Sequence, residues 1–145
     1  MKLTGFTDYT LRVLMYLALN QDELATIQGI ANAYGISESH LMKVVHHLAK
    51  SGVVESIRGK GGGIRLALAP EQIRLGRVVR EAEGSSPIVE CLGEHGTCCI
   101  TPSCKLAGVL SKAFGALYAT LDEYTLRDLV ASPQPLRGIL RIVAA

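Results

Sequence analysis

The 145-residue sequence lacks a long apolar run and a recognisable export signal. No stretch of about 18 apolar residues is present, which argues against a membrane-spanning helix. Met1–Phe6 also lacks the charged and apolar order of a signal peptide. We therefore expect a cytoplasmic protein without membrane partners. In that reducing environment, clustered cysteines are more often metal ligands or redox thiols than disulfides.

Patterns typical of enzymes are missing as well. The sequence offers no nucleophile–base set and no paired carboxylates. Gly59–Gly63 is rich in glycine, but it lacks the strand–loop–helix context that a phosphate-binding loop requires. We therefore expect a protein that is not an enzyme. An apolar fraction of 48% and a charged fraction of 19% fit one small globular domain with a helical extension.

The charge is unevenly distributed although the net charge is only +2. Residues 1–80 carry ten Lys and Arg against six Asp and Glu, whereas residues 81–145 carry five against seven. A basic first half suggests that this half binds a polyanion.

The first fifty residues contain three segments with helical spacing of apolar side chains. The first has Asp8 in its first turn, where the helix dipole favours an acid. Thr26 and Ser37 can cap the second and third segments, and Gly35 can end the second. We predict helices over three ranges: 4–20, 27–34 and 38–50.

A glycine-rich hairpin is expected directly after these helices. Val53–Arg58 and Ile64–Leu68 alternate like strands around the turn Gly59–Gly63. Two short helices followed by such a hairpin outline a winged helix-turn-helix. In that interpretation the third helix enters a major groove of DNA, and the hairpin, or wing, touches the adjacent minor groove or backbone. An ordinary hairpin with a solvated, charged turn is the alternative.

The second half begins with a predicted helix over residues 71–83, started by Pro70 and ended by Gly84. The cysteine loop, residues 84–104, follows it and loses periodicity over residues 84–100.

A long helix is predicted to start within the last residues of this loop. Thr101 is its expected cap, with Pro102 at the first helical position and Cys104 at the third, and it should end near Glu123. We infer that its apolar stripe pairs with a second copy in a homodimer, although packing on its own domain is the alternative. The stripe comprises Leu106, Val109, Leu110, Ala113, Phe114, Leu117, Tyr118 and Leu121.

Together these elements predict a mainly α fold with a small β-hairpin wing. The winged helix-turn-helix domain covers residues 1–83, and the cysteine loop covers residues 84–104. The dimerisation helix and further C-terminal helices cover residues 101–145, including a short helix capped by Thr125 and an apolar segment over residues 136–143.

All four cysteines lie in the cysteine loop, at Cys91, Cys98, Cys99 and Cys104. Structural zinc usually takes thiolates in close pairs, and the main spacings here are wider. Wider loops fit a larger object, so we predict an iron–sulfur cluster. Cys104 near a helix start favours a thiolate ligand, and the neighbours Cys98 and Cys99 are poorly placed to form a disulfide with each other.

Three thiolates leave one iron of such a cluster without a protein ligand. Candidates for the fourth ligand are Cys99, His95, Glu94 and the more distant Asp8. A carboxylate is a hard ligand on a soft-ligand cluster, so it would be labile and would open one iron to a small diatomic molecule. The residues alone do not choose among the four.

Three segments resemble a known family of regulators. Met1–Arg12, the wing Arg58–Leu66 and Cys98–Leu106 are similar to the NsrR family of nitric-oxide-sensing repressors, and Leu121–Leu129 fits as well. This family belongs to the iron–sulfur winged-helix regulators that include IscR. The resemblance covers nearly the whole chain.

The resemblance implies a homodimer that binds double-stranded DNA at an inverted-repeat operator while a 4Fe–4S cluster is intact. Nitric oxide would react with the cluster and release the repressor. Cys91, Cys98 and Cys104 match the cysteine ligands, and Asp8 matches an acidic ligand supplied by the partner subunit. Cys99 stands where relatives often have another residue, so it remains an alternative ligand. The position-matched DNA contacts are Ser37, Ser39, His40, Lys43, Arg58 and Lys60.

Two other functions remain open at this point. One is an IscR-like or general redox regulator with a 2Fe–2S cluster. The other is a zinc-stabilised adaptor that binds protein rather than DNA.

Overall fold

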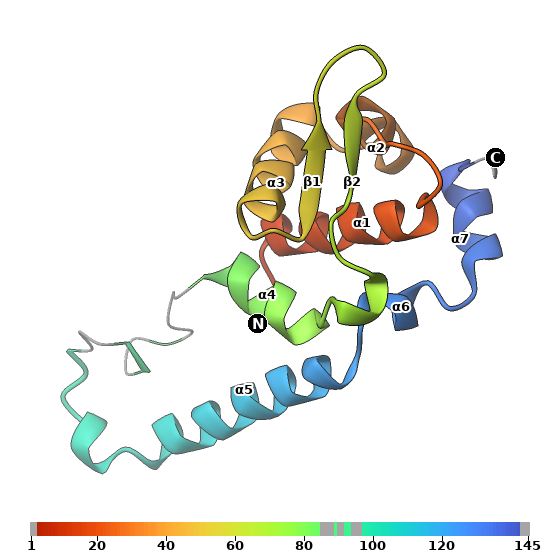
Figure 1. Cartoon of the computed structure of the whole chain (residues 1–145). Helices are drawn as coiled ribbons and strands as arrows, with labels where there is room; N and C mark the ends of the chain where they lie inside the picture. Colours follow the sequence, from red (N-terminus) through yellow and green to blue (C-terminus); the bar gives the residue numbers. More distant parts are fainter. Residues whose placement is uncertain (1–2, 85–88, 90–91, 94–96, 143–145) are drawn as a thin grey trace.

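The computed structural model describes residues 3–84, 89, 92–93 and 97–142. It contains mostly helices and one antiparallel hairpin, as expected (Figure 1). The elements are α1 (Gly5–Leu19), α2 (Ile27–Tyr34), α3 (Glu38–Lys50), β1 (Val54–Ile57), β2 (Gly63–Leu66), η1 (Pro70–Gln72), α4 (Leu75–Glu83), η3 (Thr101–Ser103), α5 (Lys105–Glu123), α6 (Leu126–Leu129) and α7 (Pro133–Leu140). In the described part of the chain, no helix combines the length and apolarity needed to cross a bilayer.

Local capping sets the ends of the N-terminal helices. The Thr4 hydroxyl accepts from the Thr7 backbone N–H at 3.2 Å, and the Thr26 hydroxyl accepts from Gly29 N–H at 3.0 Å. Gly35 ends α2 with a left-handed φ of 64°, which an L side chain adopts only with strain. The predicted cap at Thr26 and the predicted end at Gly35 are confirmed.

The core lies around α1, whose inner face packs against α3 and α4. Leu14 of α1 and Leu41 and Val44 of α3 are completely buried. Each such side chain contributes about 1.5–3 kcal/mol by leaving water. The C-terminal α7 covers the end of α1, where Arg137 Nη2 donates to the Leu19 carbonyl at 2.7 Å.

The wing hairpin pairs Val54 with Leu66 and Ile57 with Gly63. Ala25, just before α2, extends it by two backbone hydrogen bonds with Ile64, of 2.8 and 3.0 Å. A Cβ at Gly63 would collide with the Ala25 carbonyl, so only glycine allows this approach. The segment before α2 is therefore bound to the outer edge of β2, one residue from the strand end that leads into the loop.

The predicted helix over residues 71–83 is wrong in its first third. Pro70–Gln72 form the short 3-10 helix η1, and α4 begins only at Leu75. Between them, the Ile73 carbonyl accepts from Leu126 N–H at 2.9 Å, and Leu75 N–H donates to the Tyr124 carbonyl at 3.0 Å. These backbone groups bond to a distant segment instead of to the next helical turn, which interrupts the helix.

The long helix α5 leaves the globular body and extends beside α4 only near its C-terminal end (Figure 1). None of its side chains is buried, and Leu106 and Val109 are 59% and 62% exposed. Within one chain, the first turns of the helix therefore do not pack on their own domain, whereas its C-terminal part packs on α4.

The predicted start of this helix is also wrong. Thr101–Ser103 form the separate 3-10 helix η3, and α5 starts at Lys105. Cys104 is the N-cap of α5, with an extended backbone at ψ 112°, and not its third helical residue. The Ser103 N–H bonds to the Ile100 carbonyl at 3.0 Å, so this segment closes its own turn before the helix begins.

Candidate functional site

The first half of α3 presents a polar, exposed face. Ser37, Ser39, His40 and Lys43 are all exposed on it. The Ser37 hydroxyl and His40 Nδ1 form a hydrogen bond of 2.9 Å. Ser37 takes the backbone conformation of an N-cap, but its side chain bonds to His40 and caps no helix N–H. The four residues predicted to contact DNA on this helix thus share one accessible surface.

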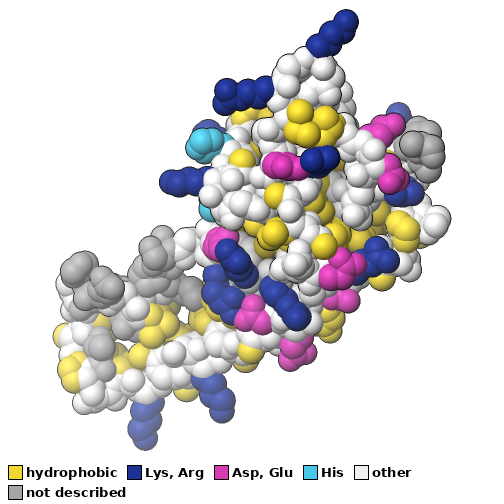
Figure 2. All heavy atoms as spheres, in the orientation of Figure 1, with side chains coloured by type: hydrophobic (Ala, Val, Ile, Leu, Met, Phe, Trp, Pro, Cys, Tyr) yellow, Lys and Arg dark blue, Asp and Glu magenta, His cyan; other side chains and the backbone are white. Residues whose placement is uncertain are grey.

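The loop of the wing carries the other two predicted DNA contacts, Arg58 and Lys60, which are both exposed. Gly59 and Gly61 take φ values of 103° and 78°, which allow the tight reversal between the strands. Arg65, directly opposite Glu55 in the register, is paired with it. Lys and Arg side chains project from this end of the molecule (Figure 2).

Two ring contacts connect α3 to α1. Tyr9 lies over His40 with ring centroids 6.0 Å apart, and Phe6 meets His47 edge-on at 5.4 Å. A pocket lined by Gly5, Phe6, Tyr9, His40 and Lys43 lies between the two helices. The first turns of α1 are therefore packed directly behind the face of α3 that is predicted to read DNA.

Asp8 lies in these first turns of α1 and is half exposed. Its Oδ2 accepts from Arg12 Nη2 at 2.9 Å, one helical turn away. The Arg12 guanidinium also lies 5.8 Å from the centroid of the Tyr34 ring. Burial, against the opposing effect of Arg12, raises the pKa of Tyr34 to about 12, so this phenol stays neutral. The Asp8 carboxylate is thus oriented by its own helix but remains accessible from outside.

Three of the four cysteines lie in the described part of the chain. Cys98 and Cys104 are half-buried, Cys99 is exposed, and all three are thiols. Cys91, Glu94 and His95 lie outside the described residues. Among the residues that are described, no three His, Cys, Asp or Glu side chains gather closely enough to hold a metal ion. The structure therefore does not bring Asp8 and two described cysteines together within one chain.

The described cysteines fit the donor set of an iron–sulfur cluster. Thiolates are the usual ligands of such clusters. Cys104, as N-cap of a 19-residue helix, lies beside the unpaired N–H groups of its first turn, which favour negative charge. Cys98 and Cys104 could supply thiolates, whereas Cys91 lies outside the described residues and Asp8 does not lie with these two cysteines within the chain.

One group of hydrogen bonds around the Glu83 carboxylate was not expected from the sequence. Glu83 Oε1 accepts from Thr4 N–H at 2.8 Å, from the Thr4 hydroxyl at 3.1 Å and from the Thr7 hydroxyl. Burial alone would raise the pKa of Glu83, but these hydrogen bonds outweigh it and lower the pKa below its ordinary value. Thr4 and Glu83 are 79 positions apart in the sequence. The local sequence could have indicated only that Thr4 caps the helix, not that Glu83 bonds to it.

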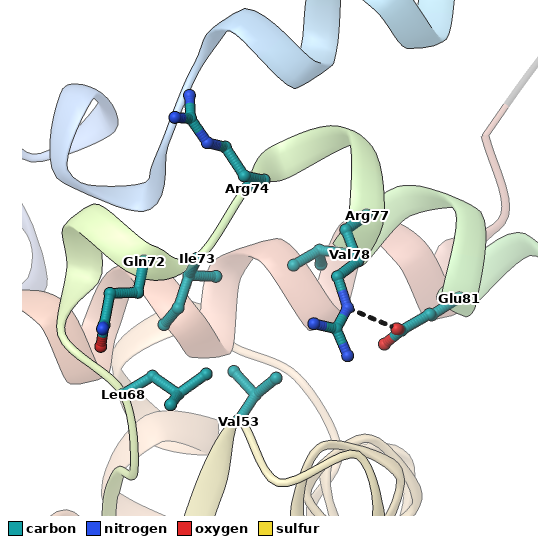
Figure 3. A pocket seen from close by; sticks show the side chains of 8 residues that line it. All are labelled: Val53, Leu68, Gln72, Ile73, Arg74, Arg77, Val78 and Glu81. Atoms are coloured by element: carbon teal, nitrogen blue, oxygen red, sulfur yellow. Dashed lines mark hydrogen bonds and ion pairs between the residues drawn. The ribbon is translucent and has the colours of Figure 1, made fainter.

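The same helix also binds the end of α5. Arg80 Nη1 donates to Asp122 Oδ1 at 3.0 Å, and Arg74 Nη1 donates to the Asp122 carbonyl at 3.3 Å. Figure 3 shows Arg74 pointing away from a small pocket between α4 and the base of the wing, whereas Arg77 and Glu81 form an ion pair at its rim. α4 thus connects the winged domain to the long helix.

Comparison with known sequences gives the family. Residues 3–132 match Rrf2, described as an iron-dependent transcriptional regulator. The chain belongs to the Rrf2 family. Rrf2 membership confirms the expectation that the protein is not an enzyme and favours gene regulation over a protein-binding adaptor.

Individual Rrf2 relatives are similar over nearly their whole length. The chain is 49% identical to the HTH-type transcriptional regulator NsrR of Bacillus licheniformis, covering 97% of this chain and 99% of that protein. It is also 49% identical to NsrR of Bacillus subtilis, with 98% and 99% covered. The resemblance to the NsrR family is confirmed.

Solved Rrf2-like structures share the fold. IscR of T. potens matches with a TM-score of 0.75 and 25% identity, over 100% of this chain and 93% of that chain. CymR, the global cysteine regulator of B. subtilis, matches with a TM-score of 0.73 and 27% identity, over 90% and 97%. These matches confirm the winged-helix fold class.

Proposed function

We propose that the protein is a homodimeric, DNA-binding repressor that senses nitric oxide through a 4Fe–4S cluster and leaves its operator when the cluster is nitrosylated. The observation that supports this most is the 45–49% identity to NsrR proteins over nearly the full chain. The geometry of the described residues supports the dimer, the thiolate donors and the DNA-binding face, each by a separate observation.

The dimer is supported by the exposed apolar face of α5. Leu106 and Val109, at 59% and 62% exposed, would be unfavourable in water on an isolated chain. A second copy of α5 would bury this face in a coiled-coil-like pair, as the three-four spacing of the stripe favours.

The cluster would be held by Cys91, Cys98 and Cys104 of one chain and by Asp8 of the partner subunit. When bound, the cluster supplies the irons with which nitric oxide reacts. Asp8 would contribute a hard oxygen ligand, which exchanges more readily than a thiolate. Its half-exposed carboxylate supports such a role, because a ligand in trans must be accessible from outside its own chain.

The DNA-binding face would be formed by α3 and the wing. Ser37, Ser39, His40 and Lys43 would contact the major groove, and Arg58 and Lys60 would contact the neighbouring minor groove or phosphates. Two such faces related by the two-fold axis of a dimer would read an inverted repeat.

The experiment combines spectroscopy with DNA binding. Anaerobically purified protein should show one broad absorption shoulder, with iron and sulfide counts near four per chain. Nitric oxide titration should release the protein from an operator fragment selected from a random DNA pool. Unchanged DNA affinity after nitric oxide treatment would contradict the proposal.

A second candidate is an IscR-like redox regulator with a 2Fe–2S cluster. The structural match to T. potens IscR and the additional thiol at Cys99 favour it. A structured spectrum with several bands, and iron near two per chain, would select this candidate over the first.

A further inference from the structure

Glu83 is the last residue of α4 and directly precedes the cysteine loop. Its side chain bonds to the start of α1, at the other end of the DNA-binding domain in the sequence. Its Oε1 accepts from the backbone N–H of Thr4 at 2.8 Å and from the hydroxyls of Thr4 and Thr7. Thr7 is completely buried, so one of these donors is shielded from water. One carboxylate oxygen thus collects three donors around the start of α1.

These bonds complete the cap of α1. The first N–H groups of a helix have no partner within the helix, and the positive end of its dipole favours a negative group. Thr4 satisfies the Thr7 N–H at 3.2 Å, and Glu83 in turn orients both threonines. The cap formed by Thr4 is therefore supported by the carboxylate of Glu83, the residue directly before the cysteine loop.

The last turns of α4 are also bound to α5. Arg80, one turn before Glu83, is paired with Asp122 near the end of α5. Gly76 packs so closely under Asp122 that a side chain there would clash. The end of α4 is thus fixed to α1 and to α5 at the point where the cysteine loop begins.

A displacement of α1 would shift α3, because side chains of the two helices are in direct contact. Phe6 and Tyr9 lie in the first turns of α1 and touch His47 and His40 of α3. Asp8, between them in sequence and next to Thr7, lies in the same turn. The start of α1 therefore contacts the root of the cysteine loop on one side and α3 on the other.

We propose that Glu83 is a positioning residue that couples the cysteine loop to α1, so that the state of the loop sets the placement of Asp8 and of α3. Glu83 acts through Thr4 and Thr7 and is not a cluster ligand. This inference rests on the proposed function, because it takes the loop to hold the cluster and Asp8 to reach the partner's loop.

The test compares Glu83→Ala with Glu81→Ala in the full-length protein. Glu81 lies on the same helix, but its ion pair with Arg77 involves neither α1 nor the loop. A third variant, Thr7→Val, removes one donor to Glu83 while keeping the shape of the buried side chain. A cooperative thermal unfolding transition of each apo protein checks that the variant is folded.

Three measurements follow on anaerobic, cluster-loaded protein: visible circular dichroism, the rate of cluster loss to an iron chelator, and affinity for the selected operator fragment. Glu83→Ala and Thr7→Val should alter the dichroism and weaken operator binding by about five- to tenfold, a typical size for coupling between sites. Combining the two should weaken it little further, because both remove the same contact. Glu81→Ala should match the wild type.

Two failures are distinguishable. Wild-type protein without an iron–sulfur spectrum would contradict the proposed function. Wild-type protein with a cluster and a nitric oxide response, but with Glu83→Ala equal to Glu81→Ala in dichroism, chelator rate and operator affinity, would overturn the inference alone. A cluster spectrum abolished by Glu83→Ala but unchanged by Thr7→Val would also overturn it, since Glu83 would then act as a ligand.

Discussion

Arg80 and Asp122 join α4 to the last turn of α5, with Arg80 Nη1 donating to Asp122 Oδ1 at 3.0 Å. The hydrogen bond from Arg80 is the main cause that lowers the pKa of Asp122. The guanidinium also lies 5.0 Å from the Tyr118 ring, one turn earlier on α5. This contact fixes the direction in which the long helix leaves the winged domain, and any dimer built on α5 inherits that direction.

Gly76→Ala should disturb this junction. A Cβ at Gly76 would overlap the Asp122 side chain, so α4 and α5 would have to separate. Overpacking of this kind costs about 1–3 kcal/mol in the free energy of unfolding. Urea denaturation followed by circular dichroism measures it. Gly115→Ala is the control, because nothing lies within 4 Å of its Cβ position and alanine favours the helix by about 1 kcal/mol. Equal midpoints for the two variants would refute the close packing.

The contribution of Glu83 to the free energy of unfolding should decrease as the pH falls. Its pKa is lowered below the ordinary 4.5 in the folded protein, so unfolded chains bind its proton more readily. The stabilisation is therefore complete above about pH 5 and is lost as pH falls through the folded pKa. The unfolding free energies of wild type and Glu83→Gln, measured by urea at several pH values, should differ at neutral pH and converge toward pH 3. A difference that does not change with pH would exclude the ionised carboxylate as the acceptor.

Asp8→Ala should change the cluster without unfolding the protein. The Asp8–Arg12 pair is half exposed, and such pairs contribute little to stability. Losing the oxygen ligand should alter the visible spectrum and the nitric oxide response of anaerobic protein. Asp22→Ala, which removes an exposed acid after α1, serves as the control. A spectrum and response identical to those of the control would remove Asp8 from the site.

Val109→Lys should weaken the dimer. Val109 is 62% exposed in the single chain, so a lysine there leaves the monomer fold intact but places a charge within the apolar face of α5. Light scattering after size-exclusion chromatography should show a shift toward monomer at micromolar concentration. Ala119→Lys places the same charge on the opposite, exposed side of α5 and should leave the mass unchanged. If both variants keep the wild-type mass, this face is not the dimer interface.

The sequence determined the features that depend on near neighbours. Thr26 caps the start of α2 and Gly35 ends it, and Gly59 and Gly61 allow the turn of the wing. These features are predictable because helix capping and a positive φ depend on only a few neighbouring residues. The apolar periodicity of α5 was visible for the same reason. The DNA-contact candidates could be placed on one helix and one loop because both elements are local.

Only the tertiary structure decided how these parts meet. The break at Ile73 exists because its carbonyl bonds to Leu126, and the cap of α1 depends on Glu83, some 79 residues away. No local pattern encodes such pairings, since their free energy arises only after the chain has folded and brought the partners together. The cysteines were evident from the sequence, but the contacts that tie the root of their loop to α1 and α5 were not.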